Sequence, residues 1–324
     1  MFAYLTFSTV ITLVMVPYNA LSSELTLDYD ERTTLTSYRI ILSSLICAVL
    51  PLKIVKMFPD ISLGYIVMGI SFGLFFALPF LAVFFSTKER KDFQQKTTSL
   101  NPYRLFLLPF KTPTFINVLC MFLFAFVAMD VVMAIVIYFM NYYLGRGGET
   151  ENVLGVLLVC QIIAIPIFVK ISERTDKRTA YLIAIIYLIA VMSFSFFITP
   201  GMPAAVIYIF AALVGFGTGG IVIMIYSIFP DMPDIDELYT GERREGLYSG
   251  IITFTRKVSS ALAIAGISTA ISLAGYNAPI KETVDGATQL IQQSQSPEFL
   301  LTLRFVFVVI PALFYIFCLI NDLR

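Results

Sequence analysis

The 324-residue sequence contains no histidine and no tryptophan, and only 14% of its residues are charged. Soluble domains usually carry about a quarter of charged residues, so the low charge content argues against a large soluble domain. Without histidine, the chain lacks the commonest catalytic base and the commonest metal ligand. Basic and acidic residues number 22 each, and this zero net charge gives no indication of a nucleic-acid partner.

Cysteine is also scarce, and its four positions do not form a motif. They are Cys47, Cys120, Cys160 and Cys318, each within an apolar run and without CxxC spacing. We expect buried hydrophobic side chains with no metal-binding or redox role. An HExxH motif is missing as well, and so are paired aspartates within the apolar runs, which argues against an intramembrane enzyme. The sequence thus predicts no enzyme, no metal site and no cofactor.

Hydrophobic residues make up 58% of the chain and are concentrated in long runs. A transmembrane helix needs about 20 mostly apolar residues. Nine segments meet this requirement, and they lie near 2–21, 38–57, 62–86, 114–144, 152–170, 179–199, 203–229, 247–275 and 298–321. The seventh contains Gly215, Gly217, Gly219 and Gly220, a cluster that favours close helix packing or a hinge. The sequence therefore predicts an all-α, multi-pass membrane protein with about nine transmembrane helices.

Basic residues are concentrated in alternate connecting segments, with the richest ones at 87–113 and 170–178. The positive-inside rule places these basic segments and the C-terminus on the cytoplasmic side of the cell (inner) membrane. The 87–113 loop separates three spans from six, whereas transporters of the major facilitator type have two six-helix halves. We therefore expect a partial N-terminal half at 1–86, a cytoplasmic central loop at 87–113 and a complete C-terminal half at 114–324. Three further helices are expected upstream.

Two segments are unusually polar for their positions. The first reads VPYNALSSELTLDYDERTTLTSYR from Val16 to Arg39, and the second reads DMPDIDELYTGERREG from Asp231 to Gly246. The second is followed by Thr-Phe-Thr-Arg-Lys at 253–257. Together they resemble the glycoside–pentoside–hexuronide:cation symporter family, with its melibiose-carrier-like members. The resemblance extends from family helix IV to helix XII and leaves family helices I–III without a counterpart.

The resemblance implies a major-facilitator helical bundle in the lipid bilayer. It also implies secondary active transport, in which a sugar or glycoside and a cation (Na⁺, H⁺ or Li⁺) cross together by alternating access. By position, four residues match sugar-contacting or neighbouring residues of the family, namely Asn19, Arg39, Thr253 and Lys257. Thr12 matches a hydroxyl of the cation site.

One departure from the family bears on coupling. A helix IV carboxylate that cation and sugar share in the melibiose carrier falls at Met15 here. The other cation-site carboxylates belong to family helix II. Two alternatives therefore stay open: an uncoupled or proton-coupled carrier of another small solute, and a truncated remnant that does not transport.

Two charges are expected near the middle of the membrane. Lys257 lies about eleven residues, or roughly 16 Å, into its predicted helix. A charge at that depth costs at least about 2.5–3.5 kcal/mol and usually faces a polar cavity with a partner. Asp130 is the only charge in 114–144, so it is either the partner of Lys257 or a proton-accepting carboxylate. We hypothesise an Asp130–Lys257 pair that lines a solute cavity. The neighbouring Arg256 points about 100° away around the helix. Snorkelling or a second ion pair would explain it as well as a functional role would.

The polar segments also predict a cytoplasmic gate. Its candidate residues are Arg32, Asp231, Asp234, Glu237 and Arg243. Ion pairs such as Arg32 with Asp231 or Asp234 would keep that side shut while the solute site opens outward. The alternative is a set of solvated loop charges, with most pairs contributing less than about 1 kcal/mol.

Overall fold

The computed structural model describes residues 2–26, 28–87, 106–242, 244–284, 287–291 and 293–322. Nine helices of 18 residues or more lie within these ranges. They are α1 (Phe2–Glu24), α2 (Tyr29–Lys56), α3 (Ile61–Ser86), α5 (Pro113–Tyr138), α6 (Thr150–Arg174), α7 (Lys177–Phe194), α8 (Ala204–Ile228), α10 (Glu245–Leu273) and α11 (Pro297–Asp322). In the described part of the chain, eight helices are long and apolar enough to cross a membrane. The predicted all-helical, multi-pass architecture is confirmed.

The start of α2 shows where hydropathy misplaces a boundary. The apolar run predicts a start near 38, yet the helix begins at Tyr29. The Asp28 carboxylate accepts hydrogen bonds from the backbone N–H groups of Asp30 and Glu31, at 2.8 and 3.2 Å. An acidic side chain in this position satisfies N–H groups that the first helical turn leaves free. The polar residues that follow are therefore helical, although they are too hydrophilic to be recognised as part of a span.

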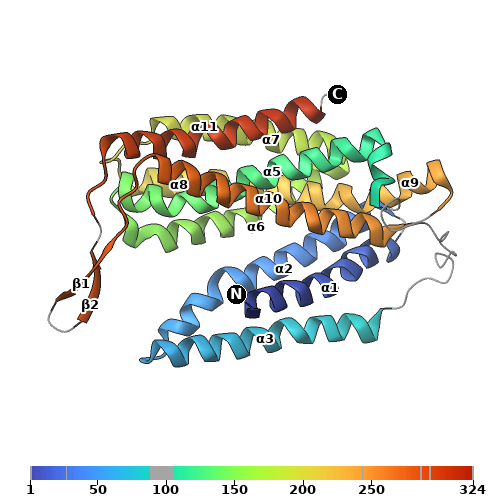
Figure 1. Ribbon diagram of the computed structural model, residues 1–324. Helices are drawn as coiled ribbons and strands as arrows, with labels where there is room; N and C mark the ends of the chain where they lie inside the picture. The colour runs from blue at the N-terminus through green and yellow to red at the C-terminus, as the bar shows by residue number, and fades with distance from the viewer. Residues whose placement is uncertain are drawn as a thin grey trace.

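The helices form two groups that meet at one end and separate at the other (Figure 1). One group is α1–α3, and the other contains the six long helices from α5 to α11. They are joined by packing of α1 against α10 and of α2 against α6 and α8. The groups approach each other on the side of α9 (Met232–Thr240), here called the closed end, and diverge toward the opposite, open end. Most of the 87–113 loop lies outside the described residues, so the division into transporter halves stays a prediction.

The glycine cluster of α8 lets this helix pack closely against α6. A methyl group added at Gly215 or Gly219 would collide with the backbone carbonyls of Leu157 and Gln161 on α6. Small residues at such contacts let two membrane helices approach closely. The packing half of the sequence prediction is therefore confirmed, and nothing in the structure tests the hinge.

Replacing Gly219 with alanine is expected to lower the free energy of unfolding by about 1–3 kcal/mol, the usual cost of overpacking. The obstacle is a backbone carbonyl of Gln161, which cannot rotate away as a flexible side chain can. Thermal unfolding in detergent, followed by circular dichroism, measures the loss. Gly266→Ala is the matched control, because Gly266 lies in helix α10 with nothing within 4 Å of an added methyl. Equal stability of the two variants would contradict the packing role.

Two short elements were not expected from the hydropathy pattern. The polar segment after α8 forms α9, which ends at Gly241 with a positive φ of 70°. Glycine is favoured there because the left-handed conformation at a helix C-terminus costs it little. The segment before α11 forms an antiparallel hairpin of β1 (Ile280–Val284) and β2 (Ala287–Ile291), which projects at the open end in Figure 1. Both α9 and the hairpin lie in segments that the sequence analysis predicted to be loops.

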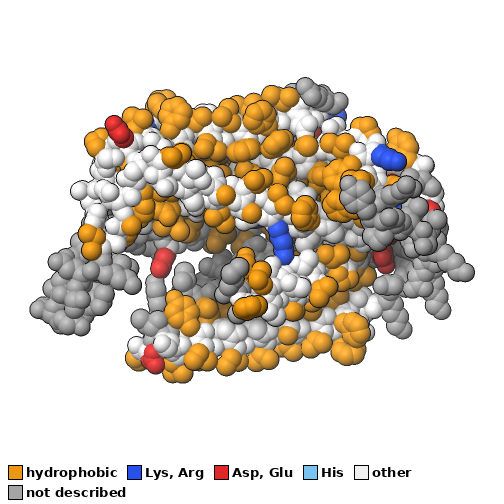
Figure 2. Space-filling view, viewed as in Figure 1, with side chains coloured by type: hydrophobic (Ala, Val, Ile, Leu, Met, Phe, Trp, Pro, Cys, Tyr) orange, Lys and Arg blue, Asp and Glu red, His pale blue; other side chains and the backbone are white. Residues whose placement is uncertain are grey.

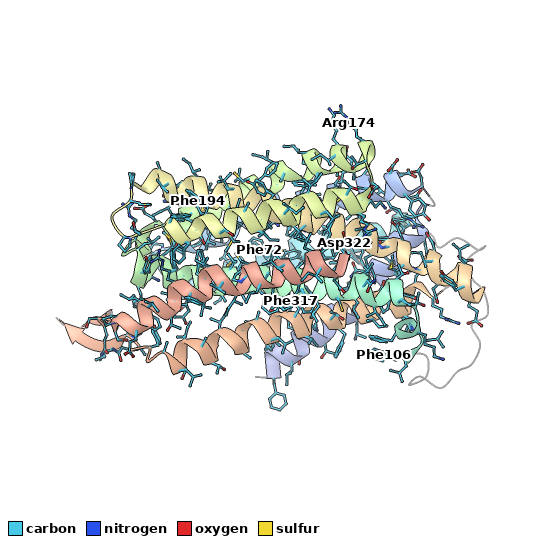
Figure 3. All side chains as sticks on the ribbon, turned by 90° about the horizontal axis from the view of Figure 1, so that it is seen from above. Phe72, Phe106, Arg174, Phe194, Phe317 and Asp322 are labelled. Atoms are coloured by element: carbon cyan, nitrogen blue, oxygen red, sulfur yellow. The ribbon has the colours of Figure 1, made fainter. Side chains whose placement is uncertain are left out.

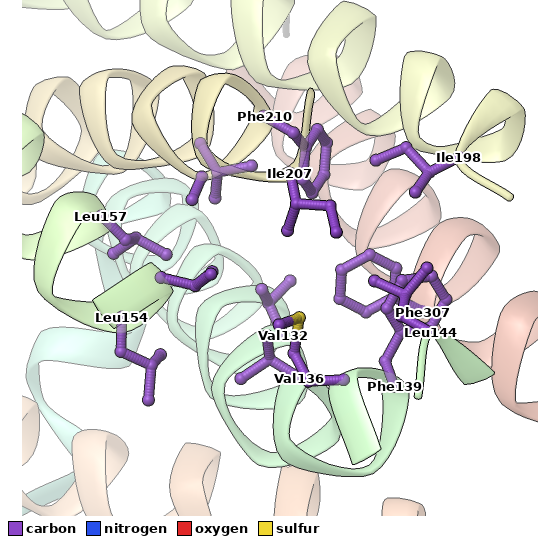
Figure 4. Close-up of a pocket in the computed structure, with 14 residues that line it drawn as sticks. Val132, Val136, Phe139, Leu144, Leu154, Leu157, Ile198, Ile207, Phe210 and Phe307 are labelled. Carbon is purple, nitrogen blue, oxygen red and sulfur yellow. The ribbon is translucent and has the colours of Figure 1, made fainter. Parts of the chain in front are cut away.

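The interior of the six-helix group is apolar and dry. A cavity of about 30 Å³ between α5, α6, α8 and α11 has only hydrophobic lining residues, among them Val136, Leu157 and Phe210 (Figure 4). A water molecule needs two to four polar partners, which this cavity does not offer. Cys318 is fully buried in the same hydrophobic core and is a free thiol. The polar chemistry of the molecule therefore lies elsewhere, between the two helix groups.

Candidate functional site

A hollow separates α1–α3 from the six-helix group, with charged side chains at its edges (Figure 2). Polar residues reach it from α1 and α2 on one side and from α5, α8 and α10 on the other. Three charged groups that sequence analysis singled out for solute binding lie on these helices, namely Arg39, Asp130 and Lys257. The hollow is therefore the candidate functional site.

Lys257 lies near the middle of α10 and reaches across to α1. Its ammonium nitrogen donates to the backbone carbonyl and the hydroxyl of Ser8, at 3.1 and 2.9 Å, and to the hydroxyl of Thr12, at 2.5 Å. The side chain is exposed to the hollow. The structure thus brings together Lys257 and Thr12, which the family resemblance assigns to solute and cation binding, and adds Ser8 as a third member.

The hypothesised pair of Asp130 and Lys257 is wrong in this conformation. Asp130 instead forms a two-pronged ion pair with Arg256, with N–O distances of 2.5 and 2.9 Å. The Arg256 guanidinium also lies 4.5 Å from the ring centre of Phe126, one turn before Asp130 on α5. Consecutive residues of a helix point about 100° apart, so α10 presents Arg256 to α5 and Lys257 to α1. Of the two explanations considered for Arg256, the second ion pair holds.

Arg39 forms the second polar cluster of the hollow. One guanidinium N–H donates to the amide oxygen of Asn19 at 3.3 Å. The guanidinium carbon lies 5.6 Å from the ring centre of Tyr18 on α1 and 5.7 Å from that of Tyr226 on α8. Asn19 and Arg39 were predicted from sequence, whereas the two tyrosines were not. Cation–π contacts from both helix groups hold this guanidinium in place.

Tyr226 lies between the Arg39 cluster and the ion pair of Asp130 with Arg256. Its ring packs edge-on against Phe126, the residue beneath the Arg256 guanidinium, with 5.8 Å between ring centres, and it lies 5.7 Å from the guanidinium carbon of Arg39. In the sequence, this residue is one aromatic among many within an apolar run. Only the packing of α8 against α2 and α5 brings it to the site.

Thr253 does not join either cluster. Its hydroxyl donates to the backbone carbonyl of Ser249 in the same helix, at 2.8 Å, and it is half-buried. Beyond Lys257, a groove of about 460 Å³ between α5 and α10 carries the hydroxyls of Tyr138, Ser268 and Ser272. Ser268 lies eleven residues after Lys257, about three helical turns further along α10 and on a similar face. This groove therefore lies between Lys257 and the open end, with both polar and apolar lining residues.

The closed end is held by Arg32, whose side chain is only 1% exposed. Its guanidinium contacts Asp231 at 3.2 Å and Asp234 at 2.6 Å, and it donates to the backbone carbonyls of Ser23 and Thr26 at 2.9 and 2.8 Å. The ion pairs predicted from sequence are therefore present. They connect α2 with the segment after α8, across the two helix groups.

Lys177 extends this network, although sequence analysis treated it only as part of a basic turn. Its ammonium nitrogen lies 2.7 Å from the second carboxylate oxygen of Asp231 and 5.2 Å from the ring centre of Tyr29. Just before it, Asp176 caps α7, and hydrogen bonds from the hydroxyl and N–H of Thr179 hold the pKa of the Asp176 carboxyl below its usual value. The α6–α7 turn thus positions a second cation against Asp231.

The gate roles of the other two predicted residues, Glu237 and Arg243, stay predictions. Glu237 lies half-buried further along α9, and its role stays a prediction. Arg243 lies outside the described residues. Its neighbour Arg244 pairs with Asp236 at 3.3 Å and with Glu242 at 2.7 Å, within the same connecting segment. The ion pairs of Arg244 connect α9 to the start of α10.

A separate ion pair joins α7 to α11 at the same end. The Arg178 guanidinium lies 3.3 Å from the carboxylate of Asp322, the last residue of α11. Figure 3 shows Asp322 among the helix ends and Arg174 pointing away from the bundle. The closed end therefore has both buried and exposed charges. The exposed Arg174 can serve as a control for substitutions of the buried Arg32.

Comparison with known proteins agrees with this architecture. The model of the family of MFS/sugar transport proteins (MFS, major facilitator superfamily) matches residues 1–321. The putative glycoside/cation symporter YagG of Escherichia coli (strain K12) is 25% identical, over 96% of this chain and 66% of that protein. A putative sulfoquinovose importer of Salmonella typhimurium is 28% identical, over 80% of this chain and 56% of that protein. The chain spans less than two thirds of the length of these curated relatives.

Solved structures show the same fold. A bacterial homologue of the iron transporter ferroportin, captured in an outward-facing state, superposes with a TM-score of 0.62 at 14% identity. The match covers 97% of this chain and 69% of the ferroportin homologue. The nine long helices, the hollow between two helix groups and the near-complete family match lead to one assignment: the chain belongs to the family of MFS/sugar transport proteins, which are membrane transporters and not enzymes.

Proposed function

We propose that the protein is a secondary active transporter that carries a sugar or glycoside together with a cation by alternating access. The observation that carries this proposal is the position of the hollow, which lies between two helix groups and is shut at one end by Arg32 with Asp231 and Asp234. The names of two relatives, a putative glycoside/cation symporter and a putative sulfoquinovose importer, support this class of solute.

Solute binding is proposed for the polar residues of the hollow. Asn19 and Arg39 form one end of the site, with Tyr18 and Tyr226 on either side of the guanidinium. Lys257 with Thr12 and Ser8 forms the other end. An amide, a guanidinium, an ammonium and several hydroxyls supply the donors and acceptors that sugar hydroxyls require. Asp130 acts through Arg256, which its carboxylate holds in place.

Alternating access is proposed to depend on the ion pairs of the closed end, which we take to face the cytoplasm. While Arg32 holds Asp231 and Asp234, the hollow is accessible only from the open end. Release of the pairs would let α2 move away from α8, so that the site opens on the opposite side. The gate roles of Glu237 and Arg243 belong to this proposal as well.

Cation coupling through Na⁺, H⁺ or Li⁺ is the least direct part of the proposal. Thr12 is the proposed cation-site hydroxyl, yet here it accepts a hydrogen bond from Lys257. Met15, three residues later on α1, offers no carboxylate. An uncoupled carrier of a small solute is therefore the second candidate, and coupling is the property to measure first.

Uptake into liposomes tests the proposal. A panel of radiolabelled glycosides is offered to the reconstituted protein with and without an imposed Na⁺ or H⁺ gradient. We expect at least one glycoside to accumulate against its gradient, and Lys257→Gln to reduce this uptake about tenfold or more, the effect of losing hydrogen bonds to a charged group. Arg304→Gln, distant on α11, is the control. Uptake that does not respond to either gradient would leave only the uncoupled carrier.

A further inference from the structure

The ammonium group of Lys257 contacts three oxygen atoms from one turn of α1. They are the backbone carbonyl of Ser8 at 3.1 Å, the hydroxyl of Ser8 at 2.9 Å and the hydroxyl of Thr12 at 2.5 Å. Ser8 and Thr12 are four residues apart, so their side chains lie on the same face of the helix. We call these three atoms the α1 oxygen cage. A lysine ammonium has three N–H donors, and the cage supplies one acceptor for each of them.

A hydrogen bond inside the cage fixes the direction of the Thr12 hydroxyl. This hydroxyl donates to the carbonyl of Ser8 at 2.5 Å. Because its one proton is used in that bond, the Thr12 oxygen presents only lone pairs to Lys257. Thr9 makes the same kind of bond, to the carbonyl of Leu5, but contacts no cation in the described structure. The cage is therefore arranged to accept hydrogen bonds from a positively charged group or to bind a cation.

No carboxylate takes part in this contact. Among the residues that the structure describes, Lys257 forms no ion pair, and both oxygens of Asp130 are bound to Arg256. Met15, three residues after Thr12 on α1, brings no charge. A charge at this depth in a membrane is normally paired or functional. The charge of Lys257 is instead stabilised by neutral oxygens alone, which is how a site of carbonyls and hydroxyls stabilises a bound metal cation.

The cage has the ligand type of a hard metal cation, but its space is already filled. Hard cations prefer oxygen ligands, and Na⁺ and Li⁺ share this preference. A metal ion at the same three oxygens would lie within a few ångströms of the Lys257 ammonium. Like charges at so short a distance repel each other strongly where little water screens them. Without a carboxylate to offset this repulsion, the cage does not fit Na⁺ or Li⁺ while the lysine side chain is in place.

We propose that the Lys257 ammonium is a built-in substitute for a metal cation: it occupies the α1 oxygen cage in place of Na⁺ or Li⁺, and its removal turns the cage into a site for these ions. This inference rests on the proposed function, because it concerns the cation of the same transporter. The contact joins α1 to α10 across the hollow. The fixed ammonium thus connects the two helix groups that a bound metal ion would otherwise connect.

Thermal unfolding of the purified protein in detergent tests this inference without any solute. The protein is melted in choline chloride, NaCl, LiCl and methylammonium chloride at equal ionic strength. Wild-type protein should melt at the same temperature in all four salts, because its cage is filled. Lys257→Ala should melt at a lower temperature in choline chloride and regain about 2 °C or more in NaCl or LiCl, since a ligand that binds only the folded state stabilises it.

Methylammonium identifies the space that the lysine side chain leaves. It carries the same three N–H donors as the lysine ammonium, whereas choline has no N–H donor. Methylammonium should therefore raise the melting temperature of Lys257→Ala and leave that of the wild type unchanged. Lys257→Arg is the matched variant, because it keeps a positive charge at the same position. It should melt at the same temperature in all four salts.

Variants of the cage test the oxygens themselves. In the Lys257→Ala background, Thr12→Val removes one cage hydroxyl and should abolish the gain in NaCl and LiCl. Thr9→Val in the same background is the control, because the Thr9 hydroxyl donates to the Leu5 carbonyl within its own helix. This second variant should keep the gain. Equal loss of the gain in both variants would contradict a site at Thr12.

The outcomes separate this inference from glycoside transport. A wild-type protein that melts at a higher temperature in NaCl or LiCl than in choline chloride overturns the inference, whatever the variants do. A loss of stability in Lys257→Ala that neither metal ion restores also overturns it, because the contact is then an ordinary structural one. Glycoside accumulation driven by a Na⁺ gradient in the wild type would support symport and overturn the inference. Failure of every glycoside to enter liposomes would reject the proposed function, while salt-independent melting of the wild type and metal-dependent melting of Lys257→Ala would still support the inference.

Discussion

Replacing Arg32 with glutamine is expected to open the closed end and to lower the free energy of unfolding by about 3–5 kcal/mol, as when one partner of a buried ion pair is removed. The guanidinium is 1% exposed and contacts Asp231 and Asp234 at 3.2 and 2.6 Å. A neutral side chain would leave the two carboxylates close together, with Lys177 still paired with Asp231. Their repulsion would drive the helix groups apart at this end.

Two measurements verify the Arg32 prediction. Thermal unfolding in detergent reports stability, and labelling of Thr36→Cys with a membrane-impermeant maleimide reports opening. Thr36 lies one turn after Arg32, is 4% exposed and should react slowly while the end is closed. The labelling uses a background in which the four native cysteines are replaced by serine.

The matched control is Arg174→Gln, because Arg174 is an exposed cation at the same end. Surface charges away from ion pairs usually change stability by less than about 0.5 kcal/mol. Asp234→Asn, alone and combined with Arg32→Gln, completes a double-mutant cycle and should show coupling above about 1 kcal/mol. If Arg32→Gln melts and labels like Arg174→Gln, the ion pairs do not hold the end closed.

The sequence predicts the helices well because a membrane imposes a simple rule on length and polarity. Each of the nine apolar runs corresponds to a helix, since backbone groups in lipid must be satisfied within the helix itself. The rule fails where a helix leaves the membrane. The first nine residues of α2 and the whole of α9 are helical but polar, and their caps at Asp28 and Gly241 are visible only locally.

Charge partners at the closed end could be predicted for a similar reason. Arg32, Asp231 and Asp234 lie in two polar segments that both follow a span on the same predicted side, so few alternative pairings exist. Lys177 was harder to recognise. It reaches Asp231 because the α6–α7 turn comes close to the end of α8, and nothing in the basic turn itself indicates this approach.

Charge partners within the hollow could not be predicted, because helix rotation decides them. Arg256 and Lys257 are neighbours in sequence, and hydropathy does not distinguish which of them faces α5. The choice depends on the packing of α10 between α1 and α5, where Arg256 covers Phe126 and Lys257 meets Thr12. Lys257 and Arg256 point about 100° apart around α10, so the rotation of this helix decides which of them faces the hollow and which pairs with Asp130.

Asp130→Asn is expected to lower the free energy of unfolding by about 1.5–3 kcal/mol, the range for hydrogen bonds to charged groups. Asp130 and Arg256 are 17% and 34% exposed, so the effect should be smaller than for Arg32. Uptake should fall about tenfold or more, because the freed guanidinium of Arg256 would compete with Arg39 and Lys257 for the solute.

Removing the remaining charge identifies the partner. If Asp130 pairs with Arg256, the double variant Asp130→Asn with Arg256→Gln should regain most of the lost stability, since it no longer leaves the Arg256 guanidinium without its carboxylate. Asp130→Asn with Lys257→Gln should then be no more stable than Asp130→Asn alone. The opposite order would restore the pair inferred from sequence. The charge-swapped variant, Asp130→Arg with Arg256→Asp, provides the strictest test. It should be more stable than either single replacement, because α5 and α10 would again present opposite charges to each other across the same contact.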